Sequence, residues 1–181
     1  MVAILEAIKD GQLSVTCPVV ISNKPDAKGL DVAKTFGVST MVINYQDFNH
    51  AEGCEAEIVK QLQKHGVQMV VLAGFMRLLK GPLLEAYQNR ILNIHPSLLP
   101  KFKGMNAQLQ ALESGDQVTG CTVHVVTKEM DAGPIIMQTA VPILDNDTQE
   151  TLSQRILEQE HQLYPKAIQA YIQEVSHESV N

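Results

Sequence analysis

The chain has 181 residues, of which 45% are apolar and 19% are charged. This size and composition predict a single domain over residues 1–181 with one packed core. The formal net charge is −6 and Lys and Arg are scattered, which weighs against nucleic-acid and anionic-membrane partners. No apolar run approaches the roughly 18 residues that a membrane span requires.

The three cysteines, Cys17, Cys54 and Cys121, are odd in number and far apart. They form neither a CxxC pair nor a disulfide framework, so we expect a reducing, cytoplasmic setting. The opening residues lack the basic region and cleavage site of a signal peptide. No spacing typical of metal ligands occurs, and no metal is expected.

Apolar periodicity and helix or strand breakers predict alternating elements along the chain. We expect helices over residues 2–10, 26–36, 47–65, 82–88, 106–114 and 148 to about 175, and strands over 14–22, 40–44, 67–75, 91–95, 122–127 and 134–144. This order predicts an α/β fold, Rossmann-like, with a mostly parallel sheet, helices on both faces and a C-terminal antiparallel strand pair. Ligands are then expected at the carboxyl ends of the strands.

Asn93 and His95 are the first candidates for chemistry. They lie two residues apart on an expected strand, so their side chains point to one face, and Pro96 ends the strand. An amide donor beside an imidazole suits a reacting carbonyl, because the amide stabilises an oxyanion and the imidazole moves a proton. A structural explanation is also open, in which the Asn caps a turn and the His is bound by backbone.

Asp131 lies in the turn sequence Met-Asp-Ala-Gly-Pro between the last two expected strands. A carboxylate close to His95 would favour the charged imidazolium and make His95 a proton donor. The alternative is an aspartate that only stabilises the turn.

Three further features are less specific. The segment 74–79 follows the most apolar strand, and it could hold a flat heterocycle or be a simple strand-to-helix junction. His124 lies on an alternating strand, where a structural histidine is common, and Glu160 lies on the charged face of the long helix. The motifs GxSxG, HExxH, GxxxxGK and GxGxxG are absent. These residues indicate carbonyl chemistry without a metal, but they do not name a reaction.

Taken together, several segments resemble the folate-dependent glycinamide ribonucleotide formyltransferases of purine biosynthesis. They are SNKPDAKGLDVAKTFGV (22–38), VVLAGFMRLL (70–79), ILNIHPSLLPKFKG (91–104), GCTVHVVTKEMDAGPII (120–136) and LEQEHQLYP (157–165). The match covers nearly the whole chain in order and spacing. The combination of NIHPSLLP with HxxxxxxDxGP is specific to folate-dependent formyltransferases.

The resemblance implies 10-formyltetrahydrofolate as formyl donor and the amine of glycinamide ribonucleotide as acceptor, both small molecules. Asn93 would bind the formyl oxygen, His95 would act as the acid, and Asp131 would keep it protonated or relay protons. Glu160 would receive the amino group of the acceptor, His124 would line the site, and the loop 97–105 would be mobile over it. The folate would contact Met76, Arg77, Leu78, Leu79, Asn93, Thr127, Lys128, Glu129, Met130 and Asp131. A monomer and a homodimer both fit.

Two sister families resemble the chain less. Methionyl-tRNA formyltransferases usually carry LPxxRGxxP where residues 99–105 read LPKFKGM, and formyltetrahydrofolate hydrolases carry an extra regulatory domain. The formyltransferases normally open with a strand and a glycine-rich loop that holds the phosphate of the ribonucleotide. This sequence resembles the family without that unit, so an inactive folate-binding remnant is the alternative function.

Overall fold

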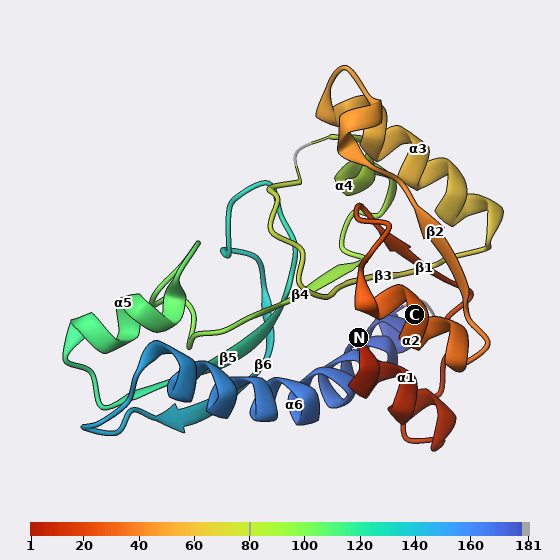
Figure 1. Cartoon of the computed structure of the whole chain (residues 1–181). Coiled ribbons are helices and arrows are strands. Elements are labelled where there is room, and N and C mark those ends of the chain that lie inside the picture. Colours follow the sequence, from red (N-terminus) through yellow and green to blue (C-terminus); the bar gives the residue numbers. More distant parts are fainter. Residues whose placement is uncertain (80, 179–181) are drawn as a thin grey trace.

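The computed structural model describes residues 1–79 and 81–178 (Figure 1). Its helices are α1 (Val2–Lys9), α2 (Lys28–Thr35), the 3-10 helix η1 (Tyr45–Asp47), α3 (Ala51–Lys64), α4 (Pro82–Ala86), α5 (Ala107–Ser114) and α6 (Gln149–Glu178). Its strands are β1 (Val19–Ser22), β2 (Ser39–Val42), β3 (Val70–Leu72), β4 (Ile91–His95), β5 (Val118–Val125) and β6 (Ile135–Pro142). No helix within these residues is long and apolar enough to cross a membrane.

The six strands form two sheets, β1-β2 and β3-β4-β5-β6. β1 and β2 pair in parallel, as do β3 and β4, whereas β5 is antiparallel to both β4 and β6. The predicted α/β class is confirmed, and the expected C-terminal antiparallel pair is β5 with β6. The expected single sheet is divided because β1 and β3 are not hydrogen-bonded neighbours.

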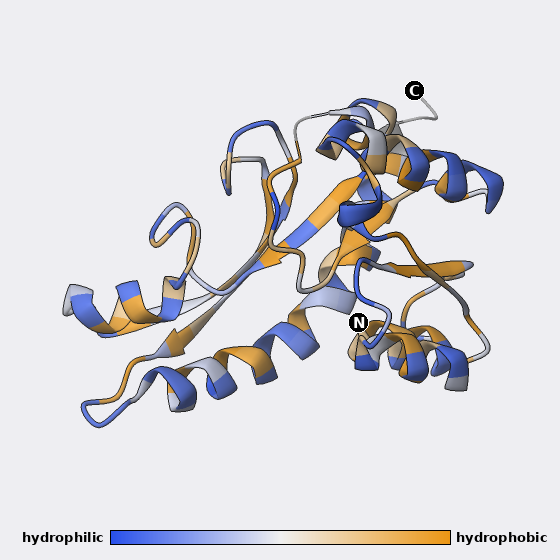
Figure 2. Ribbon diagram, turned by 45° about the horizontal axis from the view of Figure 1, so that its top comes forward, coloured by the Kyte–Doolittle hydropathy of each residue, from blue (hydrophilic) through white to orange (hydrophobic). Residues whose placement is uncertain are grey.

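Helices cover both faces of the larger sheet, as predicted. On one face, Leu92 of β4 and Val123 of β5 pack with Leu152 and Ile156 of α6 in the main core cluster. On the other face, Ile91 belongs to a smaller cluster with residues of α3 and α4. α6 alternates between apolar and polar residues along its length, as expected of a helix that buries one side (Figure 2).

Several elements are shorter than the sequence predicts. The strand expected over residues 14–22 pairs only from Val19, because Ser14 donates its N–H to Gln169 on α6 and Pro18 has no N–H to donate. The helix expected over residues 47–65 begins at Ala51, where Nδ1 of His50 caps it by accepting the N–H of Gly53. The strand expected over residues 67–75 covers only β3.

β5 begins earlier than predicted, and Gly120 is the reason that the sequence pattern misses its start. A Cβ atom at this position would lie 2.0 Å from the carbonyl oxygen of Thr139 on β6. Only glycine therefore lets the two backbones come this close. The glycine interrupts the β-branched pattern, but the strand continues through it, and Gly120 pairs with Ala140 in the β5–β6 ladder.

Candidate active site

Four polar side chains share one face of the larger sheet, and β4 and β5 position them. Because residues alternate along a strand, Asn93 and His95 point away from the α6 face to which Leu92 points. On β5, His124 lies opposite Asn93 and Thr122 lies opposite His95. His95, Thr122 and His124 are all buried. The strand ladder therefore gathers these three buried side chains next to the half-buried Asn93.

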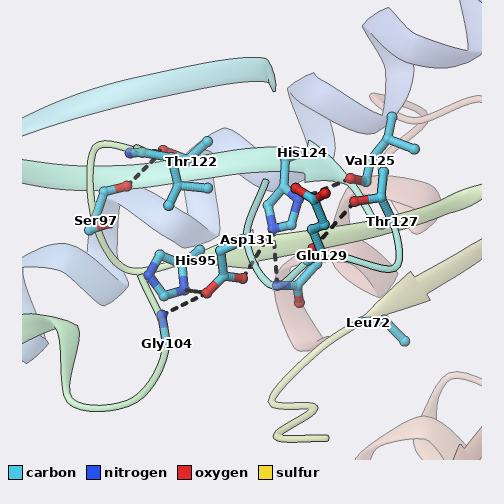
Figure 3. A network of polar contacts seen from close by, with 12 residues as sticks. Leu72, His95, Ser97, Gly104, Thr122, His124, Val125, Thr127, Glu129 and Asp131 are labelled. Atoms are coloured by element: carbon cyan, nitrogen blue, oxygen red, sulfur yellow. Dashed lines mark hydrogen bonds and ion pairs between the residues drawn. The ribbon is translucent and has the colours of Figure 1, made fainter. Parts of the chain in front are cut away.

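The loop 126–134 brings Asp131 onto the same face. Gly133 lets the loop fold back on β5, since a Cβ there would lie 1.8 Å from the carbonyl oxygen of Val125. Asp131 has a positive φ of 48°. Its Oδ2 atom lies 3.4 Å from Nδ1 of His95, and its Oδ1 atom lies 3.6 Å from Nε2 of His124 (Figure 3). The structure thus brings Asn93, His95 and Asp131, the residues predicted as catalytic, together with His124.

The ring of His95 has a defined orientation. Its Nε2 atom lies 2.8 Å from the carbonyl oxygen of Phe102. A carbonyl oxygen only accepts, so Nε2 carries a hydrogen and Nδ1 faces Asp131. The same carboxylate accepts the N–H of Gly104 at 2.8 Å. The loop after β4 therefore contacts both His95 and Asp131.

His124 orients Asn93. Its Nδ1–H donates to the carbonyl oxygen of Val125 at 3.0 Å, which leaves Nε2 of the neutral ring as an acceptor. Nδ2 of Asn93 lies 3.4 Å from that Nε2 atom. Burial lowers the pKa of His124, against the opposing effects of the Val125 carbonyl and Asp131. A neutral His124 can accept from the amide of Asn93, and it fixes which way that carboxamide faces.

The loop 97–105 is tied to the sheet at its beginning. Thr122 donates its hydroxyl hydrogen to the carbonyl oxygen of Ser97 at 2.7 Å and accepts the N–H of Leu99 at 3.1 Å. Gln138 of β6 also contacts Thr122, at 2.8 Å. The sequence interpretation missed Thr122 and Gln138. The position of Thr122, two residues before His124 on one strand, is a signal that could have placed it on the site face.

The segment 74–79 presents both exposed and buried side chains. Met76 is 89% exposed and Leu78 is 44% exposed, whereas Leu79 is buried in the smaller core cluster. The guanidinium of Arg77 lies 3.8 Å from the ring centre of Tyr45. Any contact of Leu79 with a ligand would therefore use its backbone.

The other segment expected to hold the folate is the loop 126–134. Lys128, Glu129 and Met130 are exposed, and Thr127 donates its hydroxyl hydrogen to the carbonyl oxygen of Glu129 at 3.3 Å. Phe75 and Val126 pack against the same core cluster. Both expected folate-binding segments thus border the smaller core cluster.

Glu160 is placed apart from this group. It interacts electrostatically with Cys121, which lies in the main core cluster on the α6 side of β5. Burial raises the pKa of Glu160 to about 7, partly opposed by the positive charge of the chain's amino terminus. Within residues 1–79 and 81–178, no hydrogen bond or ion pair joins Glu160 to Asn93, His95 or Asp131. The structure therefore does not bring this predicted residue together with the others.

The described part of the chain contains no group of three His, Cys, Asp or Glu side chains that could hold a metal ion. An amide donor, two imidazoles and a carboxylate can stabilise an oxyanion and move protons. Fold and site together define an α/β protein with a buried group suited to carbonyl transfer.

Comparison with known proteins makes this class specific. The family model described as formyl transferase matches residues 1–168. The chain therefore belongs to the formyl transferase family. It is 41% identical over 166 residues to the phosphoribosylglycinamide formyltransferase of Escherichia coli, covering 92% of this chain and 78% of that protein.

Other relatives differ in length. The chain is 45% identical to the human trifunctional purine biosynthetic protein adenosine-3, covering 92% of this chain but only 16% of that protein. The crystal structure of glycinamide ribonucleotide transformylase 1 from Symbiobacterium toebii superimposes with a TM-score of 0.91 at 49% identity. That superposition covers 93% of this chain and 79% of the other.

Proposed function

We propose that this protein transfers the formyl group of 10-formyltetrahydrofolate to the amine of glycinamide ribonucleotide in purine biosynthesis. The observation that carries the proposal is the position of one largely buried carboxylate, Asp131, next to both His95 and His124, beside Asn93. Relatives named for this activity support the choice of substrates. The proposal treats residues 1–181 as a single formyltransferase domain.

The first step in this account is attack of the amine nitrogen on the formyl carbon. A carbon–nitrogen bond forms, and the formyl oxygen takes up negative charge. An amide N–H of Asn93 donates to that oxygen, which lowers the energy of the tetrahedral adduct. His124 accepts the other amide hydrogen and so keeps the nitrogen of Asn93 on the side of the site.

The second step needs two proton transfers. The attacking amine loses a proton, and N10 of the folate gains one as its bond to the formyl carbon breaks. His95 supplies the proton as general acid, and Asp131 stabilises the charged imidazole and relays the proton that the amine releases. The position of Asp131 between the two imidazoles supports this role.

The folate is proposed to lie between the segment 76–79 and the loop 127–131, largely against backbone groups. The exposed side chains of Met76, Leu78 and Met130 fit a flat heterocycle with apolar faces. Glu160 is proposed to hold the amino group of the acceptor. This role rests on the resemblance of residues 157–165 to the formyltransferases, because no described hydrogen bond or ion pair joins Glu160 to Asn93, His95 or Asp131.

Nothing in the comparisons favours the alternative of an inactive remnant. We further propose that the protein works in the cytoplasm, as a monomer or homodimer, on small molecules rather than nucleic acids.

The test is to mix the purified protein with 10-formyltetrahydrofolate and follow release of tetrahydrofolate with and without glycinamide ribonucleotide. Turnover that requires the ribonucleotide and yields its formylated product is expected. Formate release without the acceptor would indicate a hydrolase instead. Binding of a folate analogue without any turnover would support the inactive remnant.

A further inference from the structure

We propose that Gln138 is a positioning residue for formyl transfer, which acts through Thr122 on the loop that follows His95. The kinetic test of this inference rests on the proposed function, whereas the hydrogen bonds from which we argue do not depend on it. Gln138 lies on β6 directly opposite Thr122 on β5, and Thr122 lies opposite His95 on β4. One row of side chains across three strands thus connects Gln138 to the site.

The Thr122 hydroxyl uses its one hydrogen and both of its lone pairs in hydrogen bonds. Its hydrogen goes to the carbonyl oxygen of Ser97, and its oxygen accepts the N–H of Leu99 and one amide hydrogen of Gln138. The second amide hydrogen of Gln138 goes to the carbonyl oxygen of Leu99 at 2.9 Å. A hydroxyl offers one hydrogen and two lone pairs, and an amide nitrogen offers two hydrogens. The network is therefore complete, and it specifies a carboxamide at position 138.

The network acts on the reacting residues through a short loop. Ser97 and Leu99 are buried and lie two and four residues after His95. The same loop then presents the carbonyl of Phe102 to Nε2 of His95 and the N–H of Gly104 to Asp131. If the loop shifts at Leu99, Phe102 and Gly104 shift with it. The hydrogen bond that fixes the ring of His95 then weakens.

Gln138→Glu tests the carboxamide with little change of shape. A carboxylate has no hydrogen to donate, so it would repel the carbonyl oxygen of Leu99. It would also compete with the carbonyl oxygen of Ser97 for the hydroxyl hydrogen of Thr122. We expect kcat to fall about tenfold or more, since small misplacements of reacting groups cost up to about 100-fold. We also expect nitrogen NMR of the histidine rings to show a changed signal for the Nε2–H that His95 donates to the Phe102 carbonyl.

A second pair of variants separates positioning from folding. Thr122→Ser keeps the hydroxyl and should retain kcat within a few-fold, whereas Thr122→Val keeps the shape and should lose as much as Gln138→Glu. Gln169→Glu is the matched control, because the half-buried side chain of Gln169 accepts a hydrogen bond from the N–H of Ser14, which a carboxylate can also do. The control should leave kcat and the His95 signal unchanged.

The outcomes are distinguishable from failure of the proposed function. If the unmodified protein shows no formyl transfer, the NMR signal of His95 in Gln138→Glu still decides the inference. A lower melting temperature in Gln138→Glu with an unchanged His95 signal would reduce Gln138 to a structural role and overturn the proposal. So would a kcat in Gln138→Glu within twofold of an active parent.

Discussion

Nδ1 of His95 lies 3.4 Å from one oxygen of Asp131, and the other oxygen of that carboxylate lies 3.6 Å from Nε2 of His124. One carboxylate thus lies beside two imidazoles in the interior. Because burial lowers the pKa of His124, that ring is neutral near pH 7, and the charge of Asp131 remains available to His95. The two histidines therefore have different roles: His124 orients Asn93, and His95 moves protons.

Asp131→Asn should lower kcat by on the order of 100-fold, because the protonated form of His95 loses its partner. Asparagine tolerates the left-handed backbone of this position, where φ is 48°, so the loop should keep its shape. Steady-state kinetics and a thermal melt check this prediction. A variant with unchanged kcat and a lower melting temperature would show that Asp131 only stabilises the turn.

Asn93→Asp should lower kcat by roughly 100- to 1,000-fold. The substitution places a negative charge where the formyl oxygen becomes an anion, and it replaces the amide hydrogen that His124 accepts. The KM for each substrate should change much less, since the interaction forms mainly in the transition state. Equal losses in kcat and in folate affinity would instead point to a role of Asn93 in binding.

Glu160→Gln should stabilise the protein at pH 8 but not at pH 4.5. The folded pKa of Glu160 is raised to about 7, so between its ordinary value of 4.5 and pH 7 the unfolded chain releases a proton that the folded chain keeps. Stability is thus lost as the pH rises through this window. Removing the carboxyl group should raise the free energy of unfolding by on the order of 2 kcal/mol at pH 8, measured by chemical denaturation. Glu158→Gln, an exposed position on the same helix, should show no such pH-dependent gain.

Asp147→Asn should lower the melting temperature at pH 7 and leave kcat at 25 °C unchanged. Asp147 accepts hydrogen bonds from Arg155, Leu144 and Thr151 at the start of α6. The Arg155 guanidinium holds the pKa of this carboxyl well below its usual range. A carboxyl whose pKa is lowered by folding stabilises the protein above about pH 4. This effect is lost as the pH falls through the pKa of the carboxyl in the folded protein. The difference in melting temperature should therefore shrink in acid, and a constant difference would contradict this origin.

The sequence predicts most of the reacting face, and local physics explains why. The strand that Pro96 ends, β4, has the bounds that the sequence predicts, residues 91–95. Alternation along that strand then puts Asn93 and His95 on one face. The turn sequence around Asp131 places a loop between β5 and β6, but only the fold of that loop brings the carboxylate to His95.

Other features depend on long-range pairing that no local pattern encodes. β1 is short because the residues before it bond to α6, far along the chain. Gln138 has no sequence signal, since its role arises from the register of β6 against β5. The position of Glu160 on the α6 side of the sheet likewise follows from how α6 packs against β5.

The most direct test of the account is His95→Gln. Glutamine can still donate to the carbonyl of Phe102, but it cannot act as an acid, so single-turnover formyl transfer should slow by roughly 100- to 10,000-fold. The Kd of a folate analogue should stay within a few-fold of the parent value. A formyl-transfer rate close to that of the parent protein would contradict the assignment of His95 as the proton donor.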